Sequence, residues 1–373
     1  MKAHLGGRLL LVLAASSAAV LAGVGAPEAP GTVAVHVSCG QVVTVNVTLD
    51  SDLSCTGDGI VIGAPHITVN LNGHTVDGDD GLGDFGILNA SGFDRVRILN
   101  GRVTDFENGV LLSGGADDNV IAHIEVRSSS FDGIVIGGGD RNIVSTNVVV
   151  ANGASGIGVG AQGDHNWIQA NSVVGNGFGG ILVVGGDNNV ISGNEVTVNA
   201  GHGISVQSGA TGNLVDSNRV FGSDAGNGVN LAAAPGNTIT RNQSDGNEGN
   251  GISLSDSDSV LVESNSVDGN DLDGIDIGTG SDLARVRLNK ALANHFHGIS
   301  VFLGASPLLE GNVATGNGVD GIETDSPTST LRHNTANANG DLGIDAVPGV
   351  TDGGGNRARA NVDPAQCADV TCT

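Results

Sequence analysis

The sequence is poor in aromatic and basic residues. It has no tyrosine, one tryptophan and 8 phenylalanines among 373 residues, so an ordinary globular core built on large side chains is excluded. The 15 Lys and Arg residues against 40 Asp and Glu give a formal net charge of −25. Nucleic acid and anionic membranes are therefore excluded as partners, because both are bound by cationic surfaces. The 62 glycines instead indicate a regular architecture with many turns.

Long apolar runs are also scarce. The only one, residues 9–21, follows the basic residues Lys2 and Arg8 and precedes small residues at 22–26. This pattern predicts a signal peptide over residues 1–26 and a protein that is secreted, extracellular or on the cell surface. No later run reaches the roughly 18 apolar residues that a membrane-spanning helix requires.

Cysteine is limited to four residues in two close pairs, Cys39 with Cys55 and Cys367 with Cys372. Their spacing matches no common zinc pattern. In an oxidising compartment, the pairs predict two local disulfides, one near each end of the chain.

What the sequence has in abundance is a repeat. Gly-Ile or Gly-Val recurs at intervals of 22 to 25 residues, with the glycine at positions 86, 109, 133, 156, 180, 203, 228, 251, 274, 298, 321 and 343. A short alternation of apolar and polar residues follows each glycine, and then a pattern such as NWIQANSV. Alternation of period two in Val- and Ile-rich segments predicts short strands, and Gly, Asn and Asp predict the turns between them.

Asparagines recur in three columns of this repeat. The first column holds Asn142, Asn166, Asn189, Asn213 and Asn237. The second holds Asn147, Asn171, Asn194, Asn218, Asn242, Asn265, Asn289, Asn312 and Asn334. The third holds Asn152, Asn176, Asn199, Asn247, Asn270, Asn294, Asn317 and Asn339.

A unit of this length cannot bury its apolar face alone, so it must stack on copies of itself. We therefore predict an all-β, single-domain parallel β-helix of about twelve to thirteen coils. Stacking brings equivalent residues within about 4.8 Å, so the asparagines should form hydrogen-bonded ladders and be mostly structural. Residues 27–80 should form an N-terminal cap and the first coils, residues 81–351 the repeats and residues 352–373 a C-terminal cap.

The repeat GIxVxG…NxIxxNxVxxN, the segment at 53–78 and the ending DGGGNRARANVDPAQCADVTC resemble secreted bacterial β-helix proteins of the NosD type, in the pectin-lyase-like superfold. The resemblance covers about residues 35–373 and implies a right-handed helix. It implies little about chemistry, because that superfold includes lyases, hydrolases, epimerases, adhesins and non-catalytic proteins.

The motifs of such enzymes are incomplete here. Lyases of this superfold use Tyr and His, or an Arg or Lys base with bound calcium; tyrosine is absent, and Arg285, Arg287 and Lys290 offer either a base or a solvated basic face. The DPHD motif of alginate-type epimerases is absent. Residues 201–205 read GHGIS, as in polygalacturonases, but the carboxylates expected one and two coils earlier are missing, so glycoside hydrolysis has no acid and base there.

The densest set of titratable residues lies around the glycines at 274, 298 and 321. The residues before them stack in one row, and the residues two positions after them stack in another. We take five of these as the candidate catalytic set: Asp273, His297, Asp320, Asp276 and Glu323. Carboxylates two coils apart would be separated by about 9.6 Å, near the upper end of the roughly 6.5–9.5 Å found in inverting glycosidases.

Two other interpretations of the same residues stay open. His295, His297, Asp271 and Asp273 could hold a metal ion, since His297 lies between carboxylates. The row before the glycines could equally be an exposed polar turn, because Asp and Asn suit turns for backbone reasons alone.

Features of a deep active site are missing. The turns vary by only a residue or two, so no long loop walls a cleft. Phe131, Phe178 and Phe296 share a position with Leu272 and Val319 that the apolar pattern predicts to point inward, which leaves few exposed aromatics for sugar stacking.

Two classes of function follow. The first, which the missing tyrosine, catalytic pairs and cleft favour, is a non-catalytic protein that binds polysaccharide or a cell-surface component on an open face. The second is a polysaccharide hydrolase or lyase that uses the Asp/His cluster. We expect a monomer, with Ca²⁺ as the only cofactor to consider.

Overall fold

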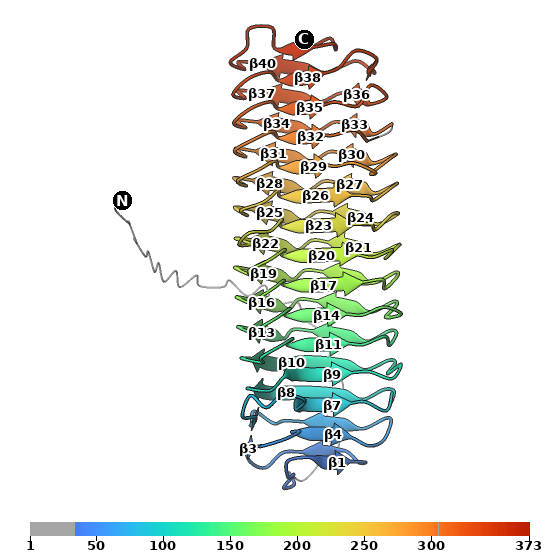
Figure 1. Ribbon diagram of the computed structural model, residues 1–373, viewed down its shortest axis with the longest axis vertical. Helices are drawn as coiled ribbons and strands as arrows, with labels where there is room; N and C mark the ends of the chain where they lie inside the picture. The colour runs from blue at the N-terminus through green and yellow to red at the C-terminus, as the bar shows by residue number, and fades with distance from the viewer. Residues whose placement is uncertain (1–33, 305) are drawn as a thin grey trace, which may run out of the picture. The chain divides into compact units, whose positions relative to one another are not determined.

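The computed structural model describes residues 34–304 and 306–373, and these form a stack of short parallel strands (Figure 1). The expected signal peptide, residues 1–26, lies outside the described residues. In the described part of the chain, no helix has the length and apolar character that crossing a membrane requires.

Each coil contributes three strands, as in β11 (Ile134–Ile136), β12 (Ile143–Ser145) and β13 (Val148–Val150). Each strand pairs in parallel with its equivalent one coil later, so that Ile134 pairs with Ile157 and Val149 with Val173. The repeat length of the sequence is therefore the length of one coil.

The strands that follow the repeating glycines form one sheet of fifteen strands, sheet 1. Its other members are β1 (Gln41–Val43), β4 (Ile60–Ile62), β7 (Phe85–Asn89), β9 (Asn108–Leu112), β14 (Ile157–Val159), β17 (Ile181–Val184), β20 (Ile204–Gln207), β23 (Val229–Ala232), β26 (Ile252–Ser255), β29 (Ile275–Ile277), β32 (Ile299–Val301), β35 (Ile322–Thr324), β38 (Ile344–Ala346) and β41 (Cys367–Ala368).

The second and third strands of each coil form sheet 2, which bends at the asparagine between them. The second strands are β2 (Val47–Thr48), β5 (Thr68–Asn70), β15 (Trp167–Gln169), β18 (Val190–Ser192), β21 (Leu214–Asp216), β24 (Thr238–Thr240), β27 (Leu261–Glu263), β30 (Arg285–Arg287), β33 (Leu308–Glu310), β36 (Thr330–Arg332) and β39 (Thr351–Asp352). The third strands are β3 (Leu53–Ser54), β6 (Thr75–Asp77), β16 (Ser172–Val174), β19 (Glu195–Thr197), β22 (Arg219–Phe221), β25 (Gln243–Asp245), β28 (Ser266–Asp268), β31 (Lys290–Leu292), β34 (Val313–Thr315), β37 (Thr335–Asn337) and β40 (Arg357–Arg359). In β8 (Arg97–Thr104) and β10 (Val120–Arg127) the two strands run on as one.

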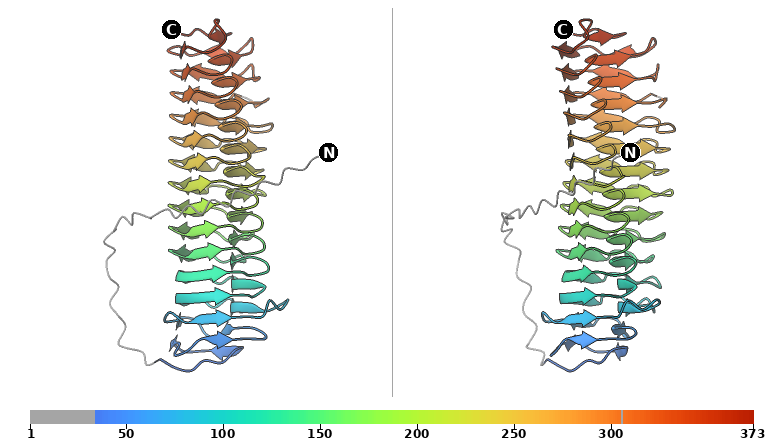
Figure 2. Two further views of the ribbon diagram at one scale, coloured as in Figure 1. Left: turned by 90° about the vertical axis from the view of Figure 1, so that its left-hand side faces the viewer. Right: turned by 60° about the vertical axis from the view of Figure 1, so that its left-hand side comes forward.

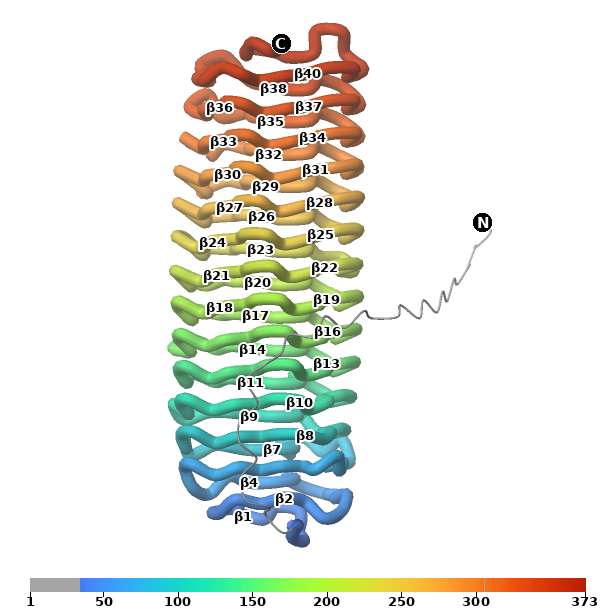
Figure 3. The backbone as a smooth tube through the Cα atoms, turned by 180° about the vertical axis from the view of Figure 1, so that it is seen from behind, coloured from blue at the N-terminus to red at the C-terminus, as the bar shows by residue number. Residues whose placement is uncertain are grey.

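The parallel β-helix prediction is confirmed, with one or two more turns than expected. Fifteen strands in sheet 1 make fourteen turns, and Figures 2 and 3 show these strands aligned from coil to coil. The additional strands are β1, β4 and β41, at the two ends. β4 does follow a Gly-Ile step, at Gly59, but β1 and β41 carry no such step.

The repeating glycine is required by close packing. A Cβ atom on Gly133 would lie 2.5 Å from Cγ1 of Val149 and 2.7 Å from the carbonyl oxygen of Gly156. Any side chain there would clash with the interior of the coil and with the next coil. The residues one and three positions after the glycine point inward. After Gly133 these are Ile134 and Ile136, and both are fully buried.

The asparagine columns form the predicted ladders. Oδ1 of Asn194 accepts hydrogen bonds from the backbone N–H and from the side-chain amide of Asn171, both at 3.0 Å, and Asn194 Nδ2 donates to the carbonyl of Ile168 at 2.8 Å. The other members repeat this arrangement and are also buried. Because the side-chain oxygens and amides of these asparagines find partners in adjacent coils, the asparagines are structural.

Both predicted disulfides are present, Cys39–Cys55 and Cys367–Cys372. Each lies at one end of the stack, where a terminal coil would otherwise present an open strand edge.

Candidate functional site

Two adjacent rows of polar side chains run along the second half of sheet 1, from β20 to β38. Together we call them the polar strip. Row 1, the residues before the glycines, holds His202, Asn227, Asn250, Asp273, His297 and Asp320. Row 2, the middle residues of the strands, holds Ser205, Asn230, Ser253, Asp276, Ser300, Glu323 and Asp345.

Row 1 is a ladder between side chains and backbone. Asp273 Oδ1 accepts a hydrogen bond from the backbone N–H of His297 at 2.8 Å, and Asp320 Oδ1 accepts one from Leu342 at 2.7 Å. Asn250 Oδ1 and His202 Nδ1 accept in the same way, at 2.8 and 2.9 Å. One acceptor atom of each of these side chains is therefore occupied by the next coil, as the polar-turn interpretation expects.

His297 is held among carboxylates. Its Nδ1 lies 3.3 Å from Asp320 Oδ2 and 3.4 Å from the Asp320 backbone nitrogen. Burial by itself lowers the pKa of His297, but the hydrogen bond to Asp320 and the charges of Asp273, Glu323 and Asp320 outweigh it and raise that pKa. At His202, in the same row, burial lowers the pKa without a carboxylate to oppose it.

The carboxylates of row 2 have their pKa values raised, and burial is the main cause. Burial raises the pKa of Asp276 to about 6; the hydrogen bond from Ser253 Oγ, at 2.9 Å, opposes this, and the charge of Asp273 adds to it. Burial also raises the pKa of Glu323, whose Oε2 accepts a hydrogen bond from Ser300 Oγ at 2.8 Å, and that of Asp345. Asp276 and Glu323 thus face each other across Ser300, one coil to either side.

The four residues considered for a metal ion are not gathered around one point. His295 Nδ1 lies 3.1 Å from Asp271 Oδ1 in an exposed pair, whereas His297 and Asp273 lie in the half-buried row 1, where the His297 ring faces Asp320. Over residues 34–304 and 306–373, no group of three or more His, Cys, Asp or Glu side chains could hold a metal ion.

The predicted inward position of the aromatic residues is wrong. The exposed fractions of Phe131, Phe178, Leu272 and Phe296 are 55, 59, 42 and 50 per cent, and Val319 is half-buried. These residues lie in the turn between the third asparagine column and the glycine, where the alternation of a strand does not hold. The buried asparagine fills the corner, so the next side chains turn outward.

The apolar residues of this turn form a border beside row 1, made of the exposed Leu272 and Phe296 and the half-buried Val319. Their backbones are hydrogen-bonded from coil to coil: Phe296 donates to Leu272 at 3.3 Å, and Val319 donates to Phe296 at 3.1 Å. The ring centroids of Phe296 and His297 are 6.5 Å apart. The apolar border and the polar strip therefore form one surface.

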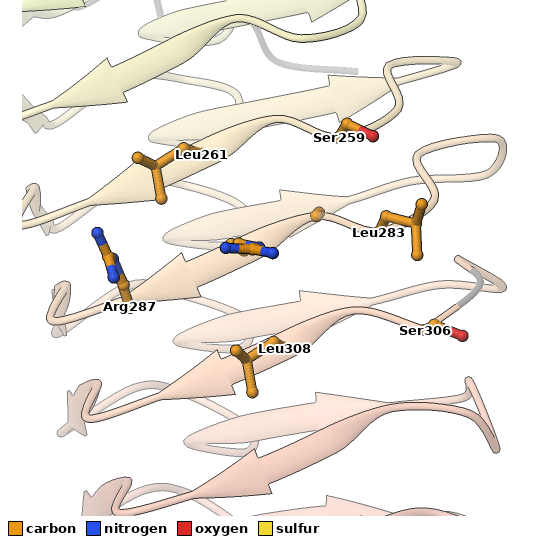
Figure 4. Close-up of a pocket in the computed structure, with 8 residues that line it drawn as sticks. Ser259, Leu261, Leu283, Arg287, Ser306 and Leu308 are labelled. Carbon is orange, nitrogen blue, oxygen red and sulfur yellow. The ribbon is translucent and has the colours of Figure 1, made fainter.

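Sheet 2 carries a separate hollow that the sequence analysis missed. It has a volume of about 530 Å³ and is lined by Ser259, Leu261, Leu283, Ala284, Arg285, Arg287, Ser306 and Leu308 (Figure 4). Of the three basic residues considered for a lyase, Arg287 is paired with Glu263 at 2.9 Å, and Arg285 and Lys290 have no ion pair within the described residues. One feature of the sequence could have indicated this hollow: leucine occupies the position equivalent to Arg285 in both neighbouring repeats, as Leu261 and Leu308.

Comparison with known proteins gives the same fold. The family model described as the right handed beta helix region matches residues 85–243, 179–313 and 227–361. No curated protein matches the chain.

Solved structures match over most of the chain. A double mutant of the periplasmic alginate epimerase AlgG is 18% identical, with a TM-score of 0.60, over 87% of this chain and 80% of that one. The A-module of the Azotobacter vinelandii mannuronan C-5 epimerase AlgE6 is 13% identical, with a TM-score of 0.60, over 89% of this chain and 91% of that one. At these identities, the likeness shows the shared fold alone.

Proposed function

Because the chain belongs to the right-handed β-helix family, we propose that it is a secreted protein that binds a polysaccharide along the polar strip. The observation that carries this proposal is the combination of the strip with the apolar border formed by Leu272, Phe296 and Val319. Both run along the axis of the stack, so they offer an extended ligand equivalent contacts in successive coils. The two disulfides support an oxidising location.

The chemistry of this surface suits sugars. Half-buried amide groups of row 1, such as those of Asn227 and Asn250, can exchange hydrogen bonds with sugar hydroxyls. An exposed ring such as that of Phe296 can cover the apolar face of a sugar. The strip holds carboxylates but no Lys or Arg, which favours neutral sugars over acidic ones. Two similar structures are named for polysaccharides, alginate and mannuronan. Both are polyuronates, so these names support a polysaccharide ligand, whereas the choice of a neutral one rests on the charge of the strip.

Affinity electrophoresis in gels that contain neutral polysaccharides tests the proposal. Phe296→Ala should weaken binding by about tenfold, because the ring loses its apolar contact with the sugar. Phe131→Ala is the matched control, because Phe131 has the same place in its coil and a similar exposure but lies outside the polar strip. Equal losses in the two variants, or no retardation by any polysaccharide, would contradict the proposal.

A second candidate function, hydrolysis of a glycosidic bond, is favoured by Asp276 and Glu323. With a pKa of about 6, Asp276 can hold the proton that a general acid gives to the leaving oxygen. An ionised Glu323, two coils away at about 9.6 Å, could accept a proton from a water above Ser300, as in an inverting mechanism. In this scheme Asp273, His297 and Asp320 position and tune the pair through the row 1 ladder.

Release of reducing ends from any bound polysaccharide, measured with and without calcium, tests this second function. Asp276→Asn and Glu323→Gln should each lower the rate about a hundredfold or more while binding persists. Asp345→Asn, in the same row, should retain the rate. If no bound polysaccharide yields reducing ends or unsaturated products, the non-catalytic function stands alone.

A further inference from the structure

The hollow on sheet 2 has an unusual distribution of charge. The parallel register places Leu261, Arg285 and Leu308 in one file and Glu263, Arg287 and Glu310 in the next. Figure 4 shows Leu261, Arg287 and Leu308 on three successive strands, with Leu283 on the preceding loop. We call this surface the arginine groove. Its volume of about 530 Å³ falls within the roughly 300–1,000 Å³ of common small-ligand sites.

The second file of the groove is electrically balanced. Arg287 Nε lies 2.9 Å from Glu263 Oε1, and Arg332 Nη2, one coil beyond the groove, lies 2.9 Å from Glu310 Oε2. Arg285 therefore supplies the uncompensated positive charge. In the part of the chain that the structure describes, no carboxylate forms an ion pair with it.

Most arginines are paired, and Arg285 shares its file with one other unpaired arginine of the described ranges, Arg97. Eight of the twelve arginines within the described ranges are paired with carboxylates, as expected for a chain with a net charge of −25. In the file of Arg285, the preceding coils mostly carry apolar side chains, such as Val190 and Leu214. The Arg285 guanidinium therefore lies between Leu261 and Leu308 on an apolar surface. This arrangement suits an anionic ligand that also has an apolar surface.

We propose that the arginine groove binds a uronic acid residue of a short oligosaccharide. The Arg285 guanidinium donates two parallel hydrogen bonds to the carboxylate, a geometry that its planar fork favours. Leu261 and Leu308 contact the apolar face of the ring, and the hydroxyls of Ser259 and Ser306 meet the sugar hydroxyls. A short ligand is favoured over a long polyanion, because the net charge of −25 repels the latter.

This site is independent of the polar strip, which lies on sheet 1 and selects neutral sugars. Its residues lie in strands β27, β30 and β33 and in the loops that precede them. A ligand can therefore occupy the arginine groove whether or not the strip binds a polysaccharide.

Isothermal titration calorimetry with trigalacturonic acid at low ionic strength tests the proposal. Arg285→Gln should raise the Kd at least about tenfold, since charge-assisted hydrogen bonds are lost, and Arg285→Lys should give an intermediate value. Arg97→Gln should leave the Kd unchanged. Arg97 is the matched control because it has the same place in its coil, is also exposed and has no ion-pair partner among the described residues.

The ligand controls separate the carboxylate from the sugar. The trimethyl ester of trigalacturonic acid should not bind measurably, and an acetylated triglutamate peptide should bind more weakly than the sugar. The proposal is overturned if wild-type protein does not bind trigalacturonic acid, if the ester binds equally well, or if Arg97→Gln loses as much as Arg285→Gln. Stronger binding of the peptide would overturn the assignment to a sugar. Phe296→Ala should not change this Kd, so a failure of the polar-strip proposal is distinguishable from a failure here.

Discussion

The two halves of sheet 1 have the same interior and different exteriors. From β4 to β17, the middle residue of each strand is apolar or glycine: Val61, Leu88, Leu111, Val135, Gly158 and Leu182. From β20 to β38, it is always polar: Ser205, Asn230, Ser253, Asp276, Ser300, Glu323 and Asp345. The inward residues of both halves are all buried, and they are isoleucine, valine or leucine except for Asn89 of β7, Thr324 of β35 and Ala346 of β38.

This difference separates the requirements of the fold from those of the proposed binding surface. A coil closes equally well with Val135 or Asp276 in the middle of its strand, because that side chain lies outside the interior contacts. The glycine, the inward aliphatic residues and the asparagines suffice for stacking. The change at Ser205 therefore marks where the surface acquires polar contacts that stacking does not require.

The largest expected effect tests the shared interior. Asn194→Ala, in the first half, and Asn289→Ala, in the second, should each reduce the free energy of unfolding by about 2–4 kcal/mol, because each leaves buried donors of the preceding coil without an acceptor. Urea unfolding followed by circular dichroism measures this. A large loss in only one variant would mean that the ladder does not stabilise both halves alike.

The next effect tests the cost of the polar exterior. The pKa of Asp276 is about 6 in the fold, against an ordinary value of 3.8, so its contribution to stability is present below 3.8 and is lost as the pH rises through 6. Asp276→Asn removes this dependence, and its stability relative to wild type should increase by about 2 kcal/mol between pH 4 and pH 8. Urea unfolding at both pH values checks it. A difference that does not change with pH would show that the Asp276 carboxylate ionises as readily in the fold as in the unfolded chain.

A smaller effect tests the boundary between the halves. Leu182 is the last apolar middle residue before the polar strip, so Leu182→Ser should extend the strip by one coil and improve polysaccharide affinity about threefold, through one added hydrogen bond. Val135→Ser makes a comparable change away from the strip and should have no effect. Affinity electrophoresis of both variants measures the difference, and equal gains would place the boundary elsewhere.

The smallest effect compares the two histidines of row 1. His297, among carboxylates, should titrate above 6.5, and the half-buried His202, at the end of the strip, should titrate below 6.5. The stability contributed by His297 is present below 6.5 and lost as the pH rises through its raised pKa; that of His202 is present above 6.5 and lost as the pH falls through its lowered pKa. NMR titration of the ring protons distinguishes them, and the reverse order would show that burial outweighs the carboxylates at His297.

Sequence reasoning succeeded where equivalent residues of successive repeats stack directly. The glycine period and the asparagine ladders were predicted correctly, because the residue contacts of one coil recur in the next. The two disulfides were predicted correctly because each joins cysteines that are close in the sequence. It also brought Asp276 and Glu323 into one row. It failed in the turn that contains Phe296, since the period of two that places side chains within a strand does not extend through a turn.

Within the candidate site, the sequence could place residues in rows but could not assign their contacts. His295 and His297 are two positions apart, yet one forms an exposed pair with Asp271 and the other lies half-buried against Asp320. The raised pKa of Asp276 depends on how far neighbouring coils bury its carboxylate, which spacing does not reveal.

The sequence by itself thus determined the parallel β-helix, its asparagine ladders and the disulfides at its two ends, because these follow from local spacing and from the direct stacking of repeats. The tertiary structure decided which side chains remain exposed and which carboxylates are desolvated, and it revealed that Arg285 is unpaired in a groove. These properties depend on contacts between residues more than twenty positions apart, and their strength depends on burial, which no repeat pattern specifies.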